Sequence, residues 1–288
     1  MGELRSIRLT RDAIVVTGPE AGWFLQGQLS QDLDGVPVGG STWGWLLQPA
    51  GKVEALLRVT RTGPDILVAD VDEGAGQAVF TRLVRYKLRT KVDLQLTTVS
   101  VGLLRGDGAA AAGEAVTAAE PTGTTVAVEA LWTPAEEAVD VVAYGAPLGP
   151  LPGTELDASA WEAERVAVGV PRMGAELDER TIPGETGLVP RTVSFTKGCY
   201  TGQELVARID SRGGNVPRRL RALRAADPLT VGAELVAGDK VVGTVTSAAV
   251  SSELGPVSLA YLGRAVVPPA RVRDGAQDVD VVELPLLG

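Results

Sequence analysis

The 288-residue chain contains no histidine and only one cysteine, Cys199. Without histidine, the protein cannot contain a histidine general base, a Ser-His-Asp triad or a histidine-ligated metal. A lone cysteine cannot form an internal disulfide, and it cannot hold zinc or an iron–sulfur cluster with the usual set of ligands. Any metal chemistry must therefore take place on another molecule or through carboxylates, and the cysteine content gives no sign of an oxidising compartment.

Long apolar runs are also lacking. Residues 1–16, MGELRSIRLTRDAIVV, carry charges where a secretory signal has an apolar segment. No stretch approaches the roughly 18 apolar residues of a membrane span. Positive charge is in deficit, because the net charge is −9, and general nucleic-acid binding depends on excess positive charge. We therefore expect a cytoplasmic protein that contacts neither a membrane nor nucleic acid directly.

The composition that is present, 45% hydrophobic, is enough for two or three domains with proper cores. A short helix around residue 24 is expected to bury Trp23, Phe24 and Leu25. The stretch 107–125, rich in Ala, Gly and Thr, is expected to be a loop or a weak connection. From about residue 220 onwards, short β runs separated by glycine turns predict a small all-β domain. Further strands are expected at 7–16 and 92–106, and further helices at 76–90 and 158–168.

The lone cysteine lies in the stretch FTKGCYTGQELVAR, residues 195–208. Gly198 and Gly202 on either side predict a tight turn, with Cys199 at or near the surface. Lys197 favours the thiolate by its charge, and Gln203 is able both to donate and to accept hydrogen bonds with a ligand. The alternative is that Cys199 is a small buried hydrophobe, as many free cysteines are.

Basic residues gather in two places despite the overall negative charge. Residues 197–224 contain seven basic and two acidic side chains, and residues 82–91 contain five basic side chains and no acidic one. Such runs are usually solvated faces of helices and loops. The other interpretation is a site for an anionic ligand or an acidic partner.

The string KGCYTGQE at 197–204 resembles the signature of the YgfZ family, folate-binding relatives of the aminomethyltransferase (T-protein) of the glycine cleavage system. Further segments are similar to that family, although Ser30-Gln31 stands where Thr-Asn is usual. These segments are FLQGQLSQDL (24–33), LLQPAGKV (46–53), ERVAVGVPRMGAEL…TIPGETGL (164–188) and VVGTVTSAA (241–249).

The resemblance implies an α+β fold with three domains arranged as a ring around a central channel. Residues 1–48 and 107–215 would form a discontinuous folate-binding domain, and residues 49–106 an inserted α+β domain. Residues 216–288 would form a C-terminal β-barrel.

The resemblance also implies tetrahydrofolate as the cofactor and no bound metal. The expected partners are folate and iron–sulfur enzymes, including some that modify tRNA, or cluster-assembly proteins. Cys199 is expected to be the working thiol, with Lys197 beside it. The residues expected to bind the cofactor are Gln203, Tyr200, Glu185, Arg208, Asp32 and Trp45.

Several of these residues have a second interpretation. Tyr200 either packs on a pterin face or fills the core, as aromatic side chains commonly do. Glu185 either contacts the folate ring or caps a turn. Arg208 either anchors a carboxylate or pairs with Glu204 or Asp210.

Three functions are therefore compared. The first is a folate-binding accessory protein for iron–sulfur enzymes. The second is a folate-dependent aminomethyltransferase, against which two alanines count, because an alignment by eye places Ala55 and Ala167 where the T-protein has its catalytic aspartate and pteridine-binding glutamate. The third is an interaction module with an inert cysteine. Whether the protein catalyses any turnover stays open.

Overall fold

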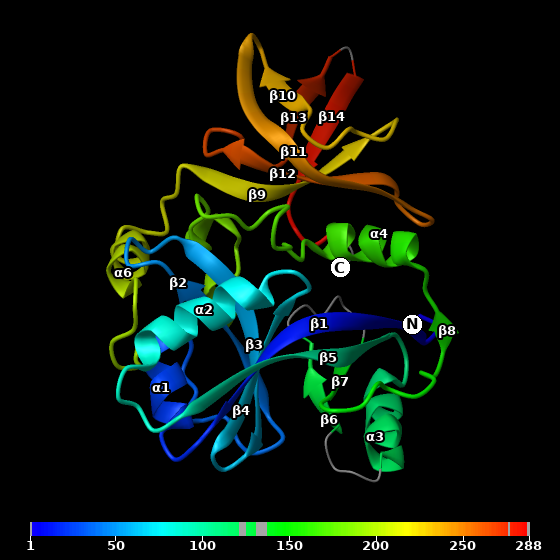
Figure 1. The fold of residues 1–288 in the computed structure, drawn as a ribbon. Coiled ribbons are helices and arrows are strands. Elements are labelled where there is room, and N and C mark those ends of the chain that lie inside the picture. Colours follow the sequence, from blue (N-terminus) through cyan, green and yellow to red (C-terminus); the bar gives the residue numbers. More distant parts are fainter. Residues whose placement is uncertain (1, 121–124, 131–136, 276, 287–288) are drawn as a thin grey trace. The chain divides into compact units, whose positions relative to one another are not determined.

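The computed structural model describes residues 2–120, 125–130, 137–275 and 277–286, and within them a curled sheet of eight strands organises the first of two units. This unit consists of Met1–Glu155 and Val189–Ala207. The second unit consists of Leu156–Leu188 and Arg208–Gly288. Each unit has its own sheet and its own buried core (Figure 1).

The strands of the first unit are β1 (Arg5–Thr17), β2 (Ser41–Leu47), β3 (Val53–Gly63), β4 (Ile66–Asp72), β5 (Asp93–Arg105), β6 (Thr125–Glu129), β7 (Ala138–Ala143) and β8 (Thr154–Glu155). Their order is β2-β3-β4-β1-β5-β7-β6, and the short β8 pairs with β1 in parallel. β1 pairs with β5 over thirteen residues, from Arg5 opposite Arg105 to Thr17 opposite Asp93. The strands expected at 7–16 and 92–106 are thus confirmed as the two longest neighbours of the sheet.

Four helices of the first unit accompany the sheet: α1 (Ala21–Gln28), α2 (Gly76–Lys87), α3 (Ala109–Ala119) and α5 (Val189–Thr192). The helix expected around residue 24 is present, and Phe24 and Leu25 are buried as predicted. The prediction for Trp23 is wrong, because its side chain is 72% exposed. A helix of eight residues has a narrow buried side, and Trp23 lies outside it.

The prediction that residues 107–125 form a loop is wrong for most of that stretch, because residues 109–119 form α3. Alanine is the best helix former, and it outweighs the single glycine in this segment. Gly113 has a packing reason: a Cβ atom there would lie 2.7 Å from Cγ1 of Val139 on β7. The glycine therefore lets α3 approach β7 closely. Residues 121–124 of the predicted loop lie outside the described residues.

A network of buried ion pairs runs across the sheet. Arg58 on β3 donates from Nε to Asp70 on β4 over 2.8 Å and from Nη1 to Asp140 on β7 over 2.9 Å. Arg11 on β1 also binds Asp70, and Arg105 on β5 also binds Asp140. Burial by itself lowers the pKa of Arg58, but the two carboxylates outweigh burial and raise this pKa above its ordinary value. The network therefore links five strands through charges that are largely buried.

The pair between Arg58 and Asp140 requires the sheet to curl. β3 and β7 are separated by three intervening strands, so a flat sheet would hold them roughly 19 Å apart at about 4.8 Å per strand. No arginine side chain spans that distance. Curling brings the two strands together across the concave face, and the ion pair closes the gap.

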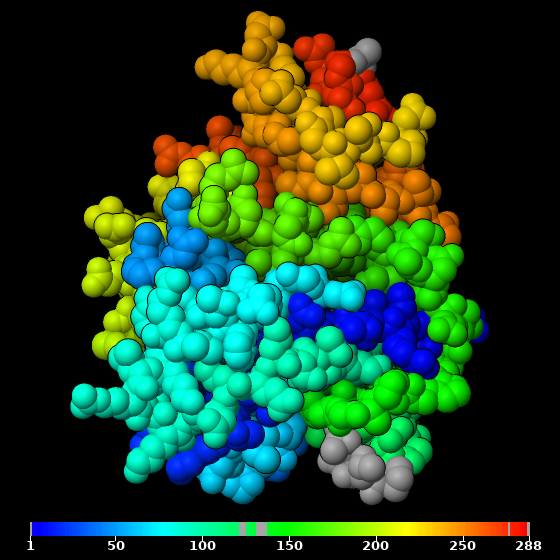
Figure 2. Space-filling view, viewed as in Figure 1, coloured from blue at the N-terminus to red at the C-terminus, as the bar shows by residue number. Residues whose placement is uncertain are grey.

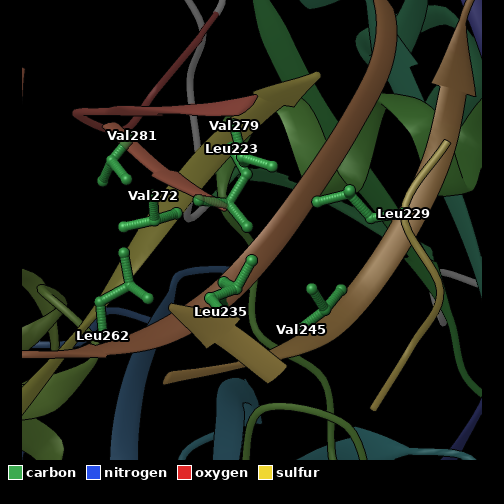
Figure 3. Packing of buried hydrophobic residues seen from close by; sticks show 9 residues of the cluster. Leu223, Leu229, Leu235, Val245, Leu262, Val272, Val279 and Val281 are labelled. Carbon is green, nitrogen blue, oxygen red and sulfur yellow. The ribbon is translucent and has the colours of Figure 1, made fainter. Parts of the chain in front are cut away.

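The second unit contains a closed barrel of six strands in the order β10-β11-β12-β9-β14-β13. The barrel closes through a bridge between Val236 on β10 and Arg273 on β13. Leu223, Leu235, Leu262 and Val279 are among the side chains that point toward one another inside it (Figure 3). The strands are β9 (Arg218–Ala225), β10 (Glu234–Ala237), β11 (Lys240–Ser251), β12 (Gly255–Gly263), β13 (Ala270–Asp274) and β14 (Gln277–Val282).

The predicted helix 158–168 is confirmed as α4 (Ala158–Val168) in the second unit. Its N-cap is Asp157, whose Oδ1 accepts hydrogen bonds from the N–H groups of Ser159 and Ala160 over 2.9 and 2.8 Å. Val166 of α4 packs against barrel residues, among them Leu259. The cap fixes where α4 begins, and the apolar contact fixes which side faces the barrel.

The predicted α+β class and C-terminal barrel are confirmed. The predicted helix 76–90 is present as α2, which ends three residues early at Lys87. The three-domain division stays a prediction, as does the ring with a central channel, which concerns the arrangement of the units. Among the helices of the described residues, none is long and apolar enough to cross a membrane.

The ion-pair network yields a test of stability. Asp70→Asn removes the main counter-charge of Arg58 and Arg11, so we expect the free energy of unfolding to fall by about 3–5 kcal/mol. Denaturant-induced unfolding measures this change. Asp93→Asn is the control, because Asp93 is 93% exposed and pairs with Lys87 at the surface of the same unit. That variant is expected to change the free energy by less than about 0.5 kcal/mol, and equal effects of the two variants would contradict the prediction.

Candidate functional site

Cys199 is exposed on the loop between α5 and α6 (Gln203–Ser211). The prediction of a surface position is confirmed, and the alternative of a buried cysteine is wrong. The turn that follows has a positive φ of 83° at Gly202. A Cβ atom at Gly202 would lie 2.5 Å from the carbonyl oxygen of Gln48, and one at Gly51 would lie 2.5 Å from Cβ of Leu205. The KGCYTGQE turn therefore packs directly on the turn of the LLQPAGKV segment.

Lys197 holds the other side of this loop. Its Nζ donates three hydrogen bonds to the carbonyl oxygens of Gln26, Leu29 and Gln31, over 2.6, 2.7 and 2.9 Å. These carbonyls lie at and just beyond the C-terminus of α1, where a helix leaves carbonyl groups without partners and favours a positive charge. Burial lowers the pKa of Lys197 to about 8, although the negative charges of Asp32 and Asp34 act to raise it. Lys197 therefore fastens the KGCYTGQE loop to the FLQGQLSQDL segment.

The FLQGQLSQDL segment is itself held in place by side chains. Gln26 donates from Nε2 to Asp32 over 2.7 Å and accepts from the N–H of Leu33 over 2.8 Å. Ser30 donates to the carbonyl oxygen of Thr192 over 2.6 Å and accepts from the N–H of Trp45 over 2.8 Å. Serine thus supplies both the donor and the acceptor that the position uses.

Two residues expected to bind the cofactor, Asp32 and Trp45, belong to this support. The bonds from Gln26 and from the N–H of Asp34 lower the pKa of Asp32. Trp45 is wholly buried, and its indole N–H donates to Oγ1 of Thr192 over 2.6 Å. Binding of a ligand by either residue stays a prediction.

Tyr200 and Gln203 complete the loop. Tyr200 is buried, which raises its pKa to about 12, and Nζ of Lys197 lies 5.3 Å from the centre of its ring. Oε1 of Gln203 accepts a hydrogen bond from the N–H of Tyr200 over 3.2 Å. The two side chains therefore stabilise the turn on which Cys199 is displayed, and a contact with a pterin stays a prediction.

The remaining two predicted residues, Glu185 and Arg208, belong to the second unit. Arg208 is exposed, and among the described residues its guanidinium forms no ion pair with Glu204 or Asp210. Glu185 is buried at the end of the 3-10 helix η1 (Pro183–Glu185), where Oε2 accepts from the N–H of Ile182 over 3.2 Å. The turn-capping role is thus present, and a contact of Glu185 with folate stays a prediction.

Glu185 lines a cavity of about 670 Å³ that lies wholly within the second unit. Its Oε1 accepts from Nε of Arg218 over 3.1 Å, and the guanidinium of Arg218 lies 4.2 Å from the centre of the Tyr261 ring. Sequence analysis missed this role for Arg218 and Tyr261. Arg218 was visible only as one member of the basic run 197–224, and Tyr261 had no signal, because its part in the cavity depends on the barrel.

Metal-ligating residues do not gather in the part of the chain that the structure describes: no group of three or more Cys, Asp or Glu side chains is arranged to hold a metal ion. Within the first unit, the chemistry that the loop presents is one exposed thiol on a braced turn. A thiolate is a nucleophile and a soft metal ligand, but alone it supplies one ligand.

Removal of the Lys197 ammonium tests its structural role. Lys197→Ala leaves the three carbonyls at the end of α1 without their shared donor, so we expect the free energy of unfolding to fall by about 2–4 kcal/mol. Lys91→Ala in the same unit is the control, because the Lys91 side chain is exposed, and a change under about 0.5 kcal/mol is expected. Chemical denaturation followed by circular dichroism measures both, and a Lys197 variant as stable as the control would refute the role.

The exposure of Cys199 is tested by its rate of alkylation. We expect iodoacetamide to modify the native protein within about tenfold of the rate for the chain unfolded in urea, because an accessible thiol needs no opening of the structure. Mass spectrometry of timed samples measures both rates. A native rate a thousandfold slower would show that the thiol is covered.

Comparison with known proteins places these segments in context. No family model matches the chain. It is 28% identical over 242 residues to the tRNA-modifying protein YgfZ of Vibrio vulnificus, covering 78% of this chain and 73% of that protein. It is 27% identical over 282 residues to the mitochondrial iron–sulfur cluster assembly factor IBA57 homologue of Chaetomium globosum, covering 88% of this chain and 64% of that longer protein.

Among solved structures, the fold matches the glycine cleavage system aminomethyltransferase T of Bartonella henselae with a TM-score of 0.82, over 99% of this chain and 86% of that chain. The sequence identity is 20%, so this likeness shows the fold alone. The resemblance predicted from KGCYTGQE is therefore confirmed: the chain is a homologue of the YgfZ and IBA57 proteins and has the fold of the glycine cleavage aminomethyltransferase.

Proposed function

We propose that this protein is a folate-binding accessory factor for the assembly or repair of iron–sulfur enzymes, including enzymes that modify tRNA, and that Cys199 is its functional thiol. The observation that carries the proposal is the position of Cys199, exposed on a loop that Lys197 and two close-packed turns hold in place. The relatives support this process, since one is an iron–sulfur cluster assembly factor homologue and another a tRNA-modifying protein.

The chemistry of the chain suits an accessory role. One thiol and no histidine supply at most one soft ligand, so a cluster would need its other ligands from a client protein. The partner in this proposal is therefore an iron–sulfur enzyme or a cluster-assembly protein. A cytoplasmic location stays a prediction from the sequence.

Folate enters the proposal through the fold. The expected cofactor residues fit folate only in part, because Trp45 is wholly buried, and Asp32 and Gln203 bind within their own segment. Glu185 does line a cavity, and its volume of about 670 Å³ is within the range of small-molecule sites, roughly 300–1,000 Å³. However, both oxygens of Glu185 already accept hydrogen bonds. The side chains predicted to bind tetrahydrofolate are therefore mostly engaged within the protein.

The runner-up, aminomethyl transfer, is disfavoured by two buried alanines. Ala55 on β3 and Ala167 on α4 are 0% and 1% exposed, and each fills core space where the T-protein has a carboxylate by our alignment. An alanine side chain offers neither a charge nor a hydrogen bond. We propose that the protein lacks this activity.

Replacement of the thiol tests the proposal in cells that lack their own relative of this protein. We expect the Cys199→Ala variant to lose most of the rescue of iron–sulfur enzyme activity, at least about tenfold, because no second soft ligand replaces the sulfur. Thr196→Ala, an exposed change on the same loop, is the matched control and is expected to rescue fully. Circular dichroism confirms that both variants fold.

Two results would contradict the proposal separately. Full rescue by folded Cys199→Ala would remove the role of the thiol. Calorimetric titration with tetrahydrofolate that shows no saturable heat would exclude folate binding, independently of the role of the thiol. Formation of methylenetetrahydrofolate from an aminomethyl donor would instead establish the runner-up.

A further inference from the structure

The cavity of the second unit contains hydrogen-bond donors that nothing in the protein uses. Tyr261, on β12, is 5% exposed, and its buried hydroxyl lies near the Thr181 side chain but has no hydrogen bond of good geometry within the described residues. Burial, with the charge of Glu185 nearby, raises the pKa of Tyr261, so the hydroxyl keeps its proton. A buried hydroxyl without a partner is uncommon in native proteins and calls for an explanation.

Arg218 contributes two more donors. Its Nε is bound to Glu185, and its guanidinium packs on the Tyr261 ring, so the side chain is fixed from two sides. Among the described residues, no hydrogen bond involves its Nη1 or Nη2, and the side chain is 33% exposed. These two nitrogens form a forked pair of donors, the geometry that matches a carboxylate or phosphate group.

The acids of the cavity, by contrast, are already satisfied. Oε1 of Glu176 accepts from Ser247 over 2.6 Å, and Oε2 accepts from Arg165 over 3.1 Å. Asp178 accepts from the N–H of Thr181 over 3.0 Å and from Nη2 of Arg180 over 2.9 Å. Glu185 binds Arg218, so each of the three acids has an arginine partner. The cavity wall therefore has no unpaired negative charge to repel an anion.

We propose that Arg218 and Tyr261 form a binding site for an oxyanion, the carboxylate or phosphate group of a small molecule. The forked guanidinium holds two oxygens of the group, and the phenol donates to one of them. Thr244, an exposed residue that also lines the cavity, offers a further hydroxyl donor. This proposal is independent of the role proposed for Cys199, which does not line the cavity.

The structure also shows why this one arginine is suited to an anion when its neighbours are not. Residues 197–224 predicted an anion site from charge alone, yet Lys197 is bound to carbonyls of α1. Arg219 donates to the carbonyl oxygen of Gly214 over 2.7 Å, and Arg221 pairs with Glu283 over 2.5 Å. Of the basic side chains in this run, Arg218 is the member that lines the cavity.

Titration of the full chain with two probes tests the site. Glutarate and inorganic phosphate are added separately at constant ionic strength, while NMR follows the Arg218 Nε–H signal and the backbone amides of Gly243 and Thr244. We expect saturable shifts of all three. Saturation by glutarate alone identifies a carboxylate site, and saturation by phosphate alone identifies a phosphate site.

Variants separate the site from nonspecific attraction. Tyr261→Phe removes a single hydroxyl from a position without a protein partner, so the fold is preserved and the dissociation constant is expected to rise about 5- to 10-fold. Arg218→Gln is expected to raise it more than about tenfold. Arg224→Gln, a change of the same kind on the same strand outside the cavity, is expected to stay within about twofold of wild type.

Three results would overturn the proposal. The first is the absence of saturable shifts with either probe. The second is a Tyr261→Phe variant that binds as tightly as wild type. The third is an Arg224→Gln variant weakened as much as Arg218→Gln, which would assign the binding to general charge.

Discussion

A charged side chain in a water-free interior is stable only when its partners surround it, and this requirement shapes the first unit. Arg58 is 1% exposed and needs Asp70 and Asp140, which lie on strands at different places in the sheet order. The three side chains meet only when the sheet curls. Flattening the sheet would therefore leave the buried Arg58 guanidinium without one of its carboxylate partners. The curled sheet in turn carries α1 and the turn after β2, the two supports of the Cys199 loop.

Most of the residues in the KGCYTGQE signature have a structural task in this arrangement. Lys197 caps α1, Tyr200 is buried, Gln203 accepts from the backbone of the turn, and Gly202 permits contact with the preceding turn. The side chains of Cys199 and Glu204 are exposed, and of these two Cys199 carries the reactive atom. The signature therefore combines one reactive atom with the parts that hold it at a defined place.

The basic cluster of residues 82–91 is divided in the same manner: Arg82 is buried against Glu54, whereas Arg85 and Arg89 lie at the surface, where α2 and the turn after it project in Figure 2.

Local patterns in the sequence correctly predicted those features that depend only on residues close together in the chain. The capped helix α4, the barrel strands with their glycine turns and the exposed Cys199 between glycines all follow from neighbours in the chain. Other features depend on residues far apart in sequence. The loop predicted for residues 107–125 gave no sign that Gly113 packs closely against Val139. The sequence placed Lys197 beside the thiol but could not show that its ammonium also binds the carbonyls at the end of α1. Arg218 and Tyr261 are far apart in the sequence and meet only because β9 and β12 pair in the barrel, so neither residue carries a signal alone.

The contact between the Gly51 and Gly202 turns has a consequence for how the sulfur atom is placed. A Cβ atom at Gly51 would collide with the side chain of Leu205, and one at Gly202 would collide with the carbonyl oxygen of Gln48, so glycine at both positions lets the two segments approach closely. Even the smallest branch at either site, 151 positions apart in the sequence, would force both segments to separate and would shift the cysteine with them. The position of the thiol therefore depends on the absence of a side chain at both glycines, and a substitution at either one is enough to change it.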